Sequence, residues 1–424
     1  MFKKILSVVL AVLMVATLVV AAASCGKTEK RLGESADLLP RKDITTNVTI
    51  PADFKVGLIT LHDENSTYDK NFIDAFKSAT KGMGIADGNV FVVSNVPESD
   101  ACYDAAVDLA KNKGCNVIFA DSFGHEAHML RAAKEFPNVQ FCHATGTQAH
   151  TAGVANYHNA FAAIYEGRYL AGIVAGMKLN EMIKDGKITA DQAVMGYVGA
   201  FTYAEVISGL TSFYLGAKSV CPSVTMKVRY TGSWYDPALE QEAAVALIEQ
   251  DKCVLISQHA DSLGAPTACQ KAGVPDVSYN GSTYTAGKDT WLVSSAINWA
   301  PYYQYVIEKA VKGETIEADW TGDIASHSVV LSGLNLDVVA EGTEAAVKEA
   351  IAKFQAGTLK VFATNTFTVE GKTLTTYTAD VDDMGDYVPE TEAIKDGYFH
   401  ESEYRSAPYF DFAIDGIEFL NTKF

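Results

Sequence analysis

Short apolar runs alternate with helical stretches through most of this 424-residue chain, and this alternation constrains the fold more than any other feature. Five runs predict a first set of strands, at Lys55–Leu61, Val90–Ser94, Val117–Ala120, Val139–His143 and Val154–Tyr157. Five more predict a second set, at Val194–Val198, Thr225–Tyr230, Val254–Ser257, Val277–Tyr279 and Trp291–Ser295. Apolar strands separated by helices are typical of parallel sheets covered on both faces. The sequence therefore predicts an α/β protein with two such sheets, one in each of two lobes.

The first 24 residues have the order of a secretory signal peptide. Two lysines precede the apolar run Ile5–Val20, and the small residues Ala21–Ser24 stand directly before Cys25. A cysteine at this place is typical of a bacterial lipoprotein signal, in which the thiol is acylated and becomes the first residue of the mature chain. The alternatives are an ordinary signal peptide with an incidental cysteine, or an uncleaved membrane anchor. We therefore expect an extracytoplasmic protein that is lipid-anchored to the bacterial membrane through Cys25.

The segments before and after the ten predicted strands differ from them in composition. Polar residues 26–51 predict a flexible tether. Beyond residue 325, the stretch Gly342–Gly357 predicts a helix, and Lys360–Thr368 and Lys372–Thr378 predict a hairpin. The expected organisation is a signal peptide (1–24), a lipid-anchored tether (25–51), an N-terminal lobe (52–158 plus 296–325), a C-terminal lobe (159–295), and a segment (326–424) that returns to the lobes and extends beyond them.

Composition and motifs exclude several classes of function. The formal net charge of −18, without a basic stripe, argues against binding to DNA or RNA polymers. The six cysteines after Cys25 form no CxxC pair, which argues against a metal site or a redox motif, although a disulfide is permitted. Cys142 and Cys253 lie in apolar runs and are predicted to be buried. Because the sequence also lacks GxGxxG, Walker A, GxSxG and HExxH motifs, we expect no cofactor, no metal and no enzymatic activity.

Aromatic and polar residues gather directly after several of the predicted strands. Ligands of open α/β sheets bind beyond the carboxyl ends of the strands, so a cleft between the two lobes is the expected site. Aromatic rings from both lobes would sandwich a flat ligand, while carboxylates and amides would recognise its edge or its hydroxyls. The residues that these stretches offer as ligand contacts are Asp63, Asn65, Thr67, Tyr68, Phe72, Ser122, Phe123, Trp234, Asp236, His259, Asp261 and Asn280.

Each of these residues also has a purely structural interpretation. Trp and Tyr at strand ends often cap a core, and Asp or Asn there often caps the following helix. Asp236, which stands directly before Pro237, fits the role of a helix cap well. For a single residue the structural interpretation is slightly favoured, whereas for the whole set ligand binding is favoured.

Four stretches resemble signature stretches of the basic membrane protein (BMP) family: Glu135–Phe141, Tyr165–Gly172, Gly196–Gly199 and Gly232–Pro237. Members of this family are lipoprotein substrate-binding components of ABC importers, typified by the purine nucleoside receptor of spirochaetes. The resemblance covers roughly residues 53–365, and its motifs occur in the family's order. It implies the type I periplasmic-binding-protein fold, with two Rossmann-like lobes and a hinge, and an ABC permease as partner.

The resemblance also implies roles for individual residues. Phe72 resembles one stacking aromatic of the family, and Trp234 takes the place of the second. Asn280 stands near the place of an aspartate that nucleoside receptors use on the ribose. A lysine expected after the last predicted strand is missing, and Asn298 and Trp299 follow there instead. This pattern looks more like a branch of the family linked to free nucleobases, and it adds Asn298 and Trp299 to the expected ligand contacts.

Three functions remain open from the sequence. The first is a solute-binding lipoprotein that captures a purine-type nucleobase or nucleoside and delivers it to an ABC permease. The second is a sensory lipoprotein that binds a sugar-like or signal molecule. The third, which has the least support, is a secreted nucleoside hydrolase.

Overall fold

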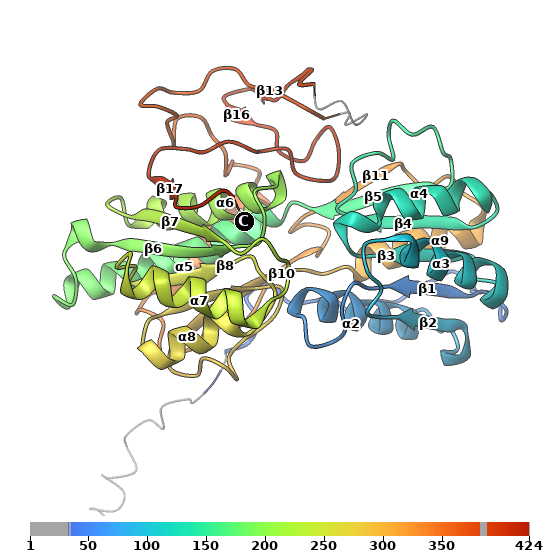
Figure 1. The fold of residues 1–424 in the computed structure, drawn as a ribbon, viewed down its shortest axis with the longest axis horizontal. Helices are drawn as coiled ribbons and strands as arrows, with labels where there is room; N and C mark the ends of the chain where they lie inside the picture. Colours follow the sequence, from blue (N-terminus) through green and yellow to red (C-terminus); the bar gives the residue numbers. More distant parts are fainter. Residues whose placement is uncertain (1–32, 34, 382–387, 424) are drawn as a thin grey trace, which may run out of the picture.

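A computed structural model describes residues 33, 35–381 and 388–423, which form two α/β lobes lying side by side (Figure 1). The predicted signal peptide and Cys25 lie outside the described residues. Within the described part of the chain, no helix combines the length and the apolar character needed to cross a membrane.

The first lobe is built on a six-stranded parallel sheet with the order β11-β5-β4-β3-β1-β2. Its strands are β1 (Val56–Ile59), β2 (Val90–Val93), β3 (Val117–Ala120), β4 (Gln140–Ala144), β5 (Tyr157–Ala162) and β11 (Asp319–Gly322). Its helices are α2 (Thr67–Gly82), α3 (Asp100–Val107), α4 (Glu126–Glu135) and α9 (Ala300–Lys312).

The second lobe is built on a seven-stranded sheet with the order β12-β10-β9-β8-β6-β7-β17, in which only the β10–β12 pair is antiparallel. Its strands are β6 (Val194–Gly199), β7 (Thr225–Tyr230), β8 (Leu255–Gln258), β9 (Asp276–Tyr279), β10 (Trp291–Ile297), β12 (Val329–Leu331) and β17 (Ile417–Phe419). Its helices are α5 (Ile164–Lys184), α6 (Ala204–Val220), α7 (Pro237–Glu249), α8 (Gly264–Ala272) and α10 (Thr343–Gln355).

Burial on both faces explains why most strands could be predicted from the sequence. Every residue of β1, β3, β8, β9 and β10 is buried, as expected for strands with helices on both faces. The helices begin at residues that satisfy their free amides: the Ser66 side chain caps α2, and Asp236 caps α7 ahead of Pro237. These caps place the N-termini of both helices at the carboxyl ends of strands, where the lobes face each other.

From β1 to β12 the chain passes between the lobes at three places: after β5, after β10, and between β11 and β12. All of β5 belongs to the first sheet, so the boundary expected between residues 158 and 159 falls inside a strand. Likewise all of β10 belongs to the second sheet, although the boundary was expected after residue 295. β5, β10 and β11 each end where the two lobes meet, so the segments that connect the lobes are short.

The segment expected to be a flexible tether is packed against the protein from Ser35 onward. Leu39 forms an antiparallel bridge with Leu331 of β12, and its side chain is only 9% exposed. Arg41 donates hydrogen bonds to the side-chain oxygens of Asn71 and Asn298. Apolar side chains and an arginine at intervals along this polar segment explain why it follows the surface of the domain.

Two further predictions differ from the structure. The fifth strand starts at Tyr157, where it was expected to end, because residues 149–156 form turns and loop. The predicted hairpin at 360–378 is wrong: Val369 and Lys372 form one isolated bridge around the turn, and β13 (Thr378–Ala379) pairs instead with β14 (Thr391–Glu392). A short strand pair, β15 (Ile394–Lys395) with β16 (Tyr398–Phe399), completes the C-terminal segment.

The six cysteines of the described residues are all buried and unpaired. The predicted burial of Cys142 and Cys253 is therefore confirmed.

Candidate ligand-binding site

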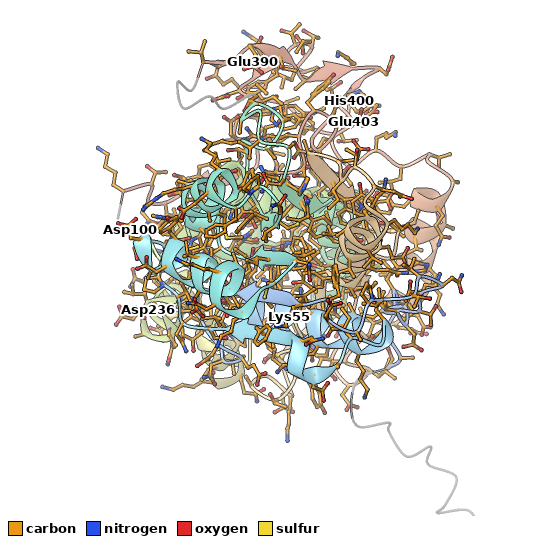
Figure 2. All side chains as sticks on the ribbon, turned by 90° about the vertical axis from the view of Figure 1, so that its right-hand side faces the viewer. Lys55, Asp100, Asp236, Glu390, His400 and Glu403 are labelled. Atoms are coloured by element: carbon orange, nitrogen blue, oxygen red, sulfur yellow. The ribbon has the colours of Figure 1, made fainter. Side chains whose placement is uncertain are left out.

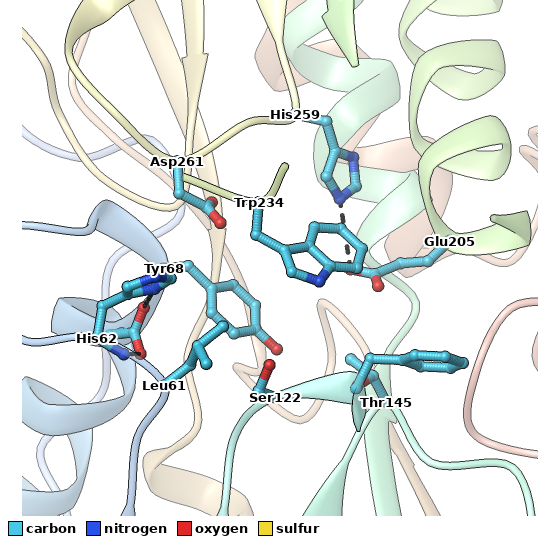
Figure 3. Close-up of a pocket in the computed structure, with 11 residues that line it drawn as sticks. Leu61, His62, Tyr68, Ser122, Thr145, Glu205, Trp234, His259 and Asp261 are labelled. Carbon is cyan, nitrogen blue, oxygen red and sulfur yellow. Dashed lines mark hydrogen bonds and ion pairs between the residues drawn. The ribbon is translucent and has the colours of Figure 1, made fainter. Parts of the chain in front are cut away.

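A pocket lies where the loops at the carboxyl ends of strands from both sheets meet (Figure 3). It contains about 360 Å³ of space free of atoms, open solvent at its mouth included. The first lobe contributes Leu61, His62, Tyr68, Asp69, Ser122, Phe123 and Thr145, and the second contributes Glu205, Trp234, His259 and Asp261. The position agrees with the rule that ligands bind beyond strand carboxyl ends.

Two aromatic side chains enter the pocket from opposite lobes. Tyr68 comes from the first turn of α2, and its hydroxyl donates a 2.7 Å hydrogen bond to the Asp121 carbonyl. Trp234 comes from the loop after β7 and packs edge-on against Phe201, with ring centroids 4.9 Å apart. Each ring is therefore held by its own lobe, and both rings add apolar surface to the pocket.

Carboxyl groups surround these rings on the side of α2. Asp69 accepts hydrogen bonds from the His62 amide (2.7 Å) and the Ser66 hydroxyl (2.6 Å). Burial by itself would raise the Asp69 pKa, but hydrogen bonds from the His62 side chain, the Ser66 hydroxyl and the His62 amide outweigh it and lower the pKa. At Asp261, burial and the negative charge of Asp69 raise the pKa well above its usual range. The site thus holds one carboxylate favoured in its ionised form and one carboxyl favoured in its protonated form, which are an acceptor and a donor.

A second polar cluster lies on the side of the second lobe. His259 Nε2 lies 3.4 Å from Glu205 Oε1, and burial lowers the pKa of His259. Beneath them Arg168 of α5 is completely buried; it donates a 3.1 Å hydrogen bond to the Gln258 carbonyl and lies 4.6 Å from the ring centroid of Tyr279. The buried positive charge of Arg168 disfavours a second one, which favours the neutral imidazole.

Direct contacts join the two lobes at the rim of the pocket. Thr67 donates two 3.0 Å hydrogen bonds, from its amide and its hydroxyl, to the carbonyl of Asp261. Phe123 of the first lobe stacks on Tyr203 of the second, with ring centroids 5.2 Å apart. The structure therefore represents a conformation in which the lobes touch across the cleft.

Six of the fourteen predicted contact residues line the pocket: Tyr68, Ser122, Phe123, Trp234, His259 and Asp261. Eight do not: Asp63, Asn65, Thr67, Phe72, Asp236, Asn280, Asn298 and Trp299. Asp63 and Asn65 bond to each other in an exposed turn, and Thr67 joins the lobes at the rim.

The remaining five have other partners. Phe72 is 2% exposed and stacks on Trp299 with ring centroids 4.2 Å apart, so these two rings form a core contact. Asp236 accepts 3.0 Å hydrogen bonds from two amides at the start of α7, as its structural interpretation predicted. Asn280 donates to the Asp261 carboxyl, and Asn298 bonds to residues near the interlobe crossing. Asn280 therefore positions a residue of the pocket without lining it.

Five residues that line the pocket were missed by sequence reasoning: Leu61, His62, Asp69, Thr145 and Glu205. Leu61, His62 and Asp69 lie in or beside the polar stretch after β1, so their neighbourhood was identified but not the individual side chains. Thr145 directly follows β4, and Glu205 lies in the first turn of α6 after β6. Both would have been found if every residue from the carboxyl end of a predicted strand through the first turn of the next helix had been counted as a candidate contact.

The fold and the interlobe pocket define a class: two-lobed ligand-binding proteins of the type I periplasmic-binding-protein fold. A solved ABC-transporter solute-binding protein from Conexibacter woesei shares this fold, with a TM-score of 0.58 and 21% identity over 72% of this chain and 98% of that one. Residues 59–359 match the family described as ABC transporter substrate-binding protein PnrA-like (Bmp), and the chain belongs to this family. The family consists of substrate-binding proteins rather than enzymes, and such proteins of ABC importers work outside the cytoplasm.

Two relatives of known name are similar to this chain. A purine-binding protein of Brucella abortus is 33% identical over 59% of this chain and 66% of its own length. A Haloferax volcanii protein, named as a candidate ABC transporter glucose-binding protein, is 35% identical over 49% of each chain. The chain thus spans about two thirds and one half of these relatives.

Proposed function

We propose that this protein captures a purine-type nucleobase or nucleoside between its two lobes and delivers it to an ABC permease. The observation that carries the proposal is the pair of aromatic rings, Tyr68 and Trp234, that enter one pocket from opposite lobes. A purine offers two π-faces for such rings and an edge of donors and acceptors for the surrounding carboxyl, hydroxyl and imidazole groups. The purine-binding relative from Brucella abortus supports the same ligand class.

The proposal is tested by titration calorimetry of the full-length protein in detergent against adenine, guanine, hypoxanthine and their nucleosides. Stacking on an aromatic side chain contributes roughly 1–3 kcal/mol per base, so Trp234→Ala should weaken binding about tenfold to a hundredfold. Trp234→Phe should retain much of the affinity. Trp320→Ala is the control, because Trp320 lies on β11 and packs against Tyr302 and Tyr305 rather than in the pocket.

Binding of every purine weaker than about millimolar, or an unchanged affinity of Trp234→Ala, would refute the purine assignment. Glucose belongs in the same titration, because the Haloferax volcanii relative carries a glucose-binding name and aromatic rings flanked by carboxylates also suit a sugar. Glucose binding in place of purines would favour this second candidate ligand.

We also propose that the protein is held to the membrane by a lipid on Cys25. The support is the position of Cys25 directly after a signal-like apolar run and small residues. Cys25→Ser should move the protein from the detergent phase to the aqueous phase of a phase-partitioning assay without changing its affinity for ligand. Retention of the variant in the detergent phase would contradict the lipid anchor.

A further inference from the structure

Residues 360–424 lie beyond the part of the chain that matches the family, and their described part, except for β17, forms a layer above the second lobe that reaches toward the first (Figure 1). We name this layer the C-terminal strap. In the view turned by 90°, Glu390, His400 and Glu403 of the strap lie at the top of the molecule, above Lys55 of the first lobe (Figure 2).

The strap has an aromatic core of its own. Phe410 stacks on Phe362, with ring centroids 4.6 Å apart, and packs against Phe399 and Phe412 at 4.9 and 4.1 Å. The Arg405 side chain is buried in the same layer and donates hydrogen bonds to three backbone carbonyls of the strap. Packing of this kind lets the strap move as one body.

The strap is joined to the second lobe by a continuous set of contacts. Strand β17 extends the seven-stranded sheet by pairing with β7 over three residues. The Asn421 side chain accepts from the Tyr230 amide (2.9 Å) and donates to the Tyr230 carbonyl (2.8 Å). Glu401, which is 2% exposed, accepts a hydrogen bond from Ser208 of α6.

The contacts of the strap with the first lobe are hydrogen bonds at β11, where the Thr321 hydroxyl donates to the Ser402 carbonyl (3.4 Å). Asp319 of β11 accepts hydrogen bonds from the amide (2.8 Å) and the hydroxyl (2.6 Å) of Ser406. The other carboxylate oxygen of Asp319 lies 3.2 Å from Nδ1 of His150, in the loop after β4. A solvent-open hollow lies between the strap, the first-lobe loops that carry Phe123 and Thr145, and residues 202–205 of the second lobe.

These two attachments differ in strength. The β17–β7 ladder is continued by the Asn421 hydrogen bonds and the buried Glu401–Ser208 bond, and such a set opens only by local unfolding. The few separate hydrogen bonds to Thr321 and Asp319 can each be exchanged for bonds to water. A change in the angle between the lobes must therefore break the weaker attachment first. We propose that the C-terminal strap is a permanent part of the second lobe and a latch that holds the first lobe, through Asp319 and Ser406, when the cleft is closed.

The latch gives the strap a role in ligand release, and this part of the inference rests on the proposed function. A contact made only in the closed conformation stabilises that conformation relative to the open one, so it slows the dissociation of a ligand enclosed between the lobes. Loss of both hydrogen bonds to Asp319 should speed dissociation by about tenfold.

The first experiment locates the strap by spin-label distance measurements on the full-length protein in detergent. Labels are attached at three exposed positions through Lys111→Cys (first lobe), Glu249→Cys (second lobe) and Thr373→Cys (strap). On addition of adenine, the distance between 249 and 373 should stay constant, while the distances from 111 to both other labels should shorten together. A constant distance between 111 and 373, with a changing distance between 249 and 373, would overturn the proposal.

The second experiment tests the latch without any ligand. Asp319→Ala should broaden the distribution between positions 111 and 373 toward longer distances, and Ser406→Ala, which keeps the amide donor, should do so to a smaller extent. Asp251→Ala is the matched control, because Asp251 is a comparably buried carboxylate whose ion pair with Arg229 lies within the second lobe. Identical distributions for Asp319→Ala and the parent protein would overturn the latch.

Adenine dissociation, followed by stopped-flow tryptophan fluorescence, completes the test. Asp319→Ala should release adenine about tenfold faster than the parent protein or Asp251→Ala. An unchanged rate would overturn the role in release. If calorimetry shows no purine binding, the proposed function fails, while the ligand-free distances still decide the latch.

Discussion

The role of Phe72 can be decided by experiment. The family resemblance predicts that its ring contacts the ligand, whereas the structure places the ring in the core. Its ring is 2% exposed, stacks on Trp299 and touches Tyr68, with ring centroids 4.9 Å apart. Truncating a buried phenylalanine costs about 3–5 kcal/mol, and the aromatic pair accounts for ~0.5–1.5 kcal/mol of interaction beyond buried area. Phe72→Ala should therefore lower the free energy of unfolding by about 3–5 kcal/mol.

The affinity for ligand should change little in the same variant. Tyr68 keeps its hydrogen bond to the Asp121 carbonyl, so its ring stays in the pocket, and we expect less than about a threefold loss of adenine affinity. Urea denaturation measures the stability, and titration calorimetry measures the affinity. Phe72→Leu, which retains most of the apolar volume, should show the same pattern with a smaller loss of stability.

Phe76→Ala is the matched control. Phe76 lies one turn further along α2, is completely buried, and packs edge-on against Phe119 and Tyr303. Both alanine variants should lose similar stability and keep similar affinity. A loss of more than about tenfold in adenine affinity for Phe72→Ala, with Phe76→Ala unaffected, would refute the assignment of Phe72 to the core.

Three other substitutions test features of the fold. Gly172→Ala should destabilise the protein by ~1–3 kcal/mol or more in urea titrations, because its Cβ would lie 2.0 Å from the Phe213 carbonyl oxygen; Gly88→Ala, in open space, is the control. Asp236→Ala should cost ~0.5–2 kcal/mol of stability as a lost helix cap, and a changed affinity without that loss would contradict the cap. Burial raises the pKa of Glu401 from 4.5 to about 7, so its contribution to stability is present below pH 4.5 and is lost as the pH rises through 7, by about 3 kcal/mol. Melting temperatures from pH 5 to 8 should fall more steeply for the parent protein than for Glu401→Gln, and parallel curves would exclude this effect.

The apolar strands could be predicted from the sequence because burial on both faces leaves an uninterrupted run. Nine of the ten predicted strands overlap most of an observed strand, and the remaining one, Val154–Tyr157, overlaps β5 only at Tyr157. β11 and β17 escaped prediction since their exposed polar residues, such as Thr321 and Glu418, interrupt the apolar pattern in strands of four and three residues. Edge strands of this kind are specified by the partner strand rather than by their own composition.

The candidate site was predictable in position but only partly in its residues. The loops after the strands can be recognised from the sequence, whereas the direction of each side chain cannot. Tyr68 and Phe72 illustrate this limit: they are four residues apart on the same face of α2, yet one ring reaches the pocket and the other packs on Trp299. Which turn of α2 faces the cleft depends on how the two lobes pack against each other, and the sequence pattern does not contain that information.

Strand β17 has a consequence for the solubility of the protein. Without it, β7 would end the second sheet with a free row of amide and carbonyl groups, which is a template for pairing with another chain. β17 covers that row and replaces it with an edge of three residues, whose central residue, Glu418, is exposed and charged. Proteolytic loss of the last eight residues would therefore leave the pocket residues in place but expose the edge of β7, and the shortened molecules would associate edge to edge through that strand.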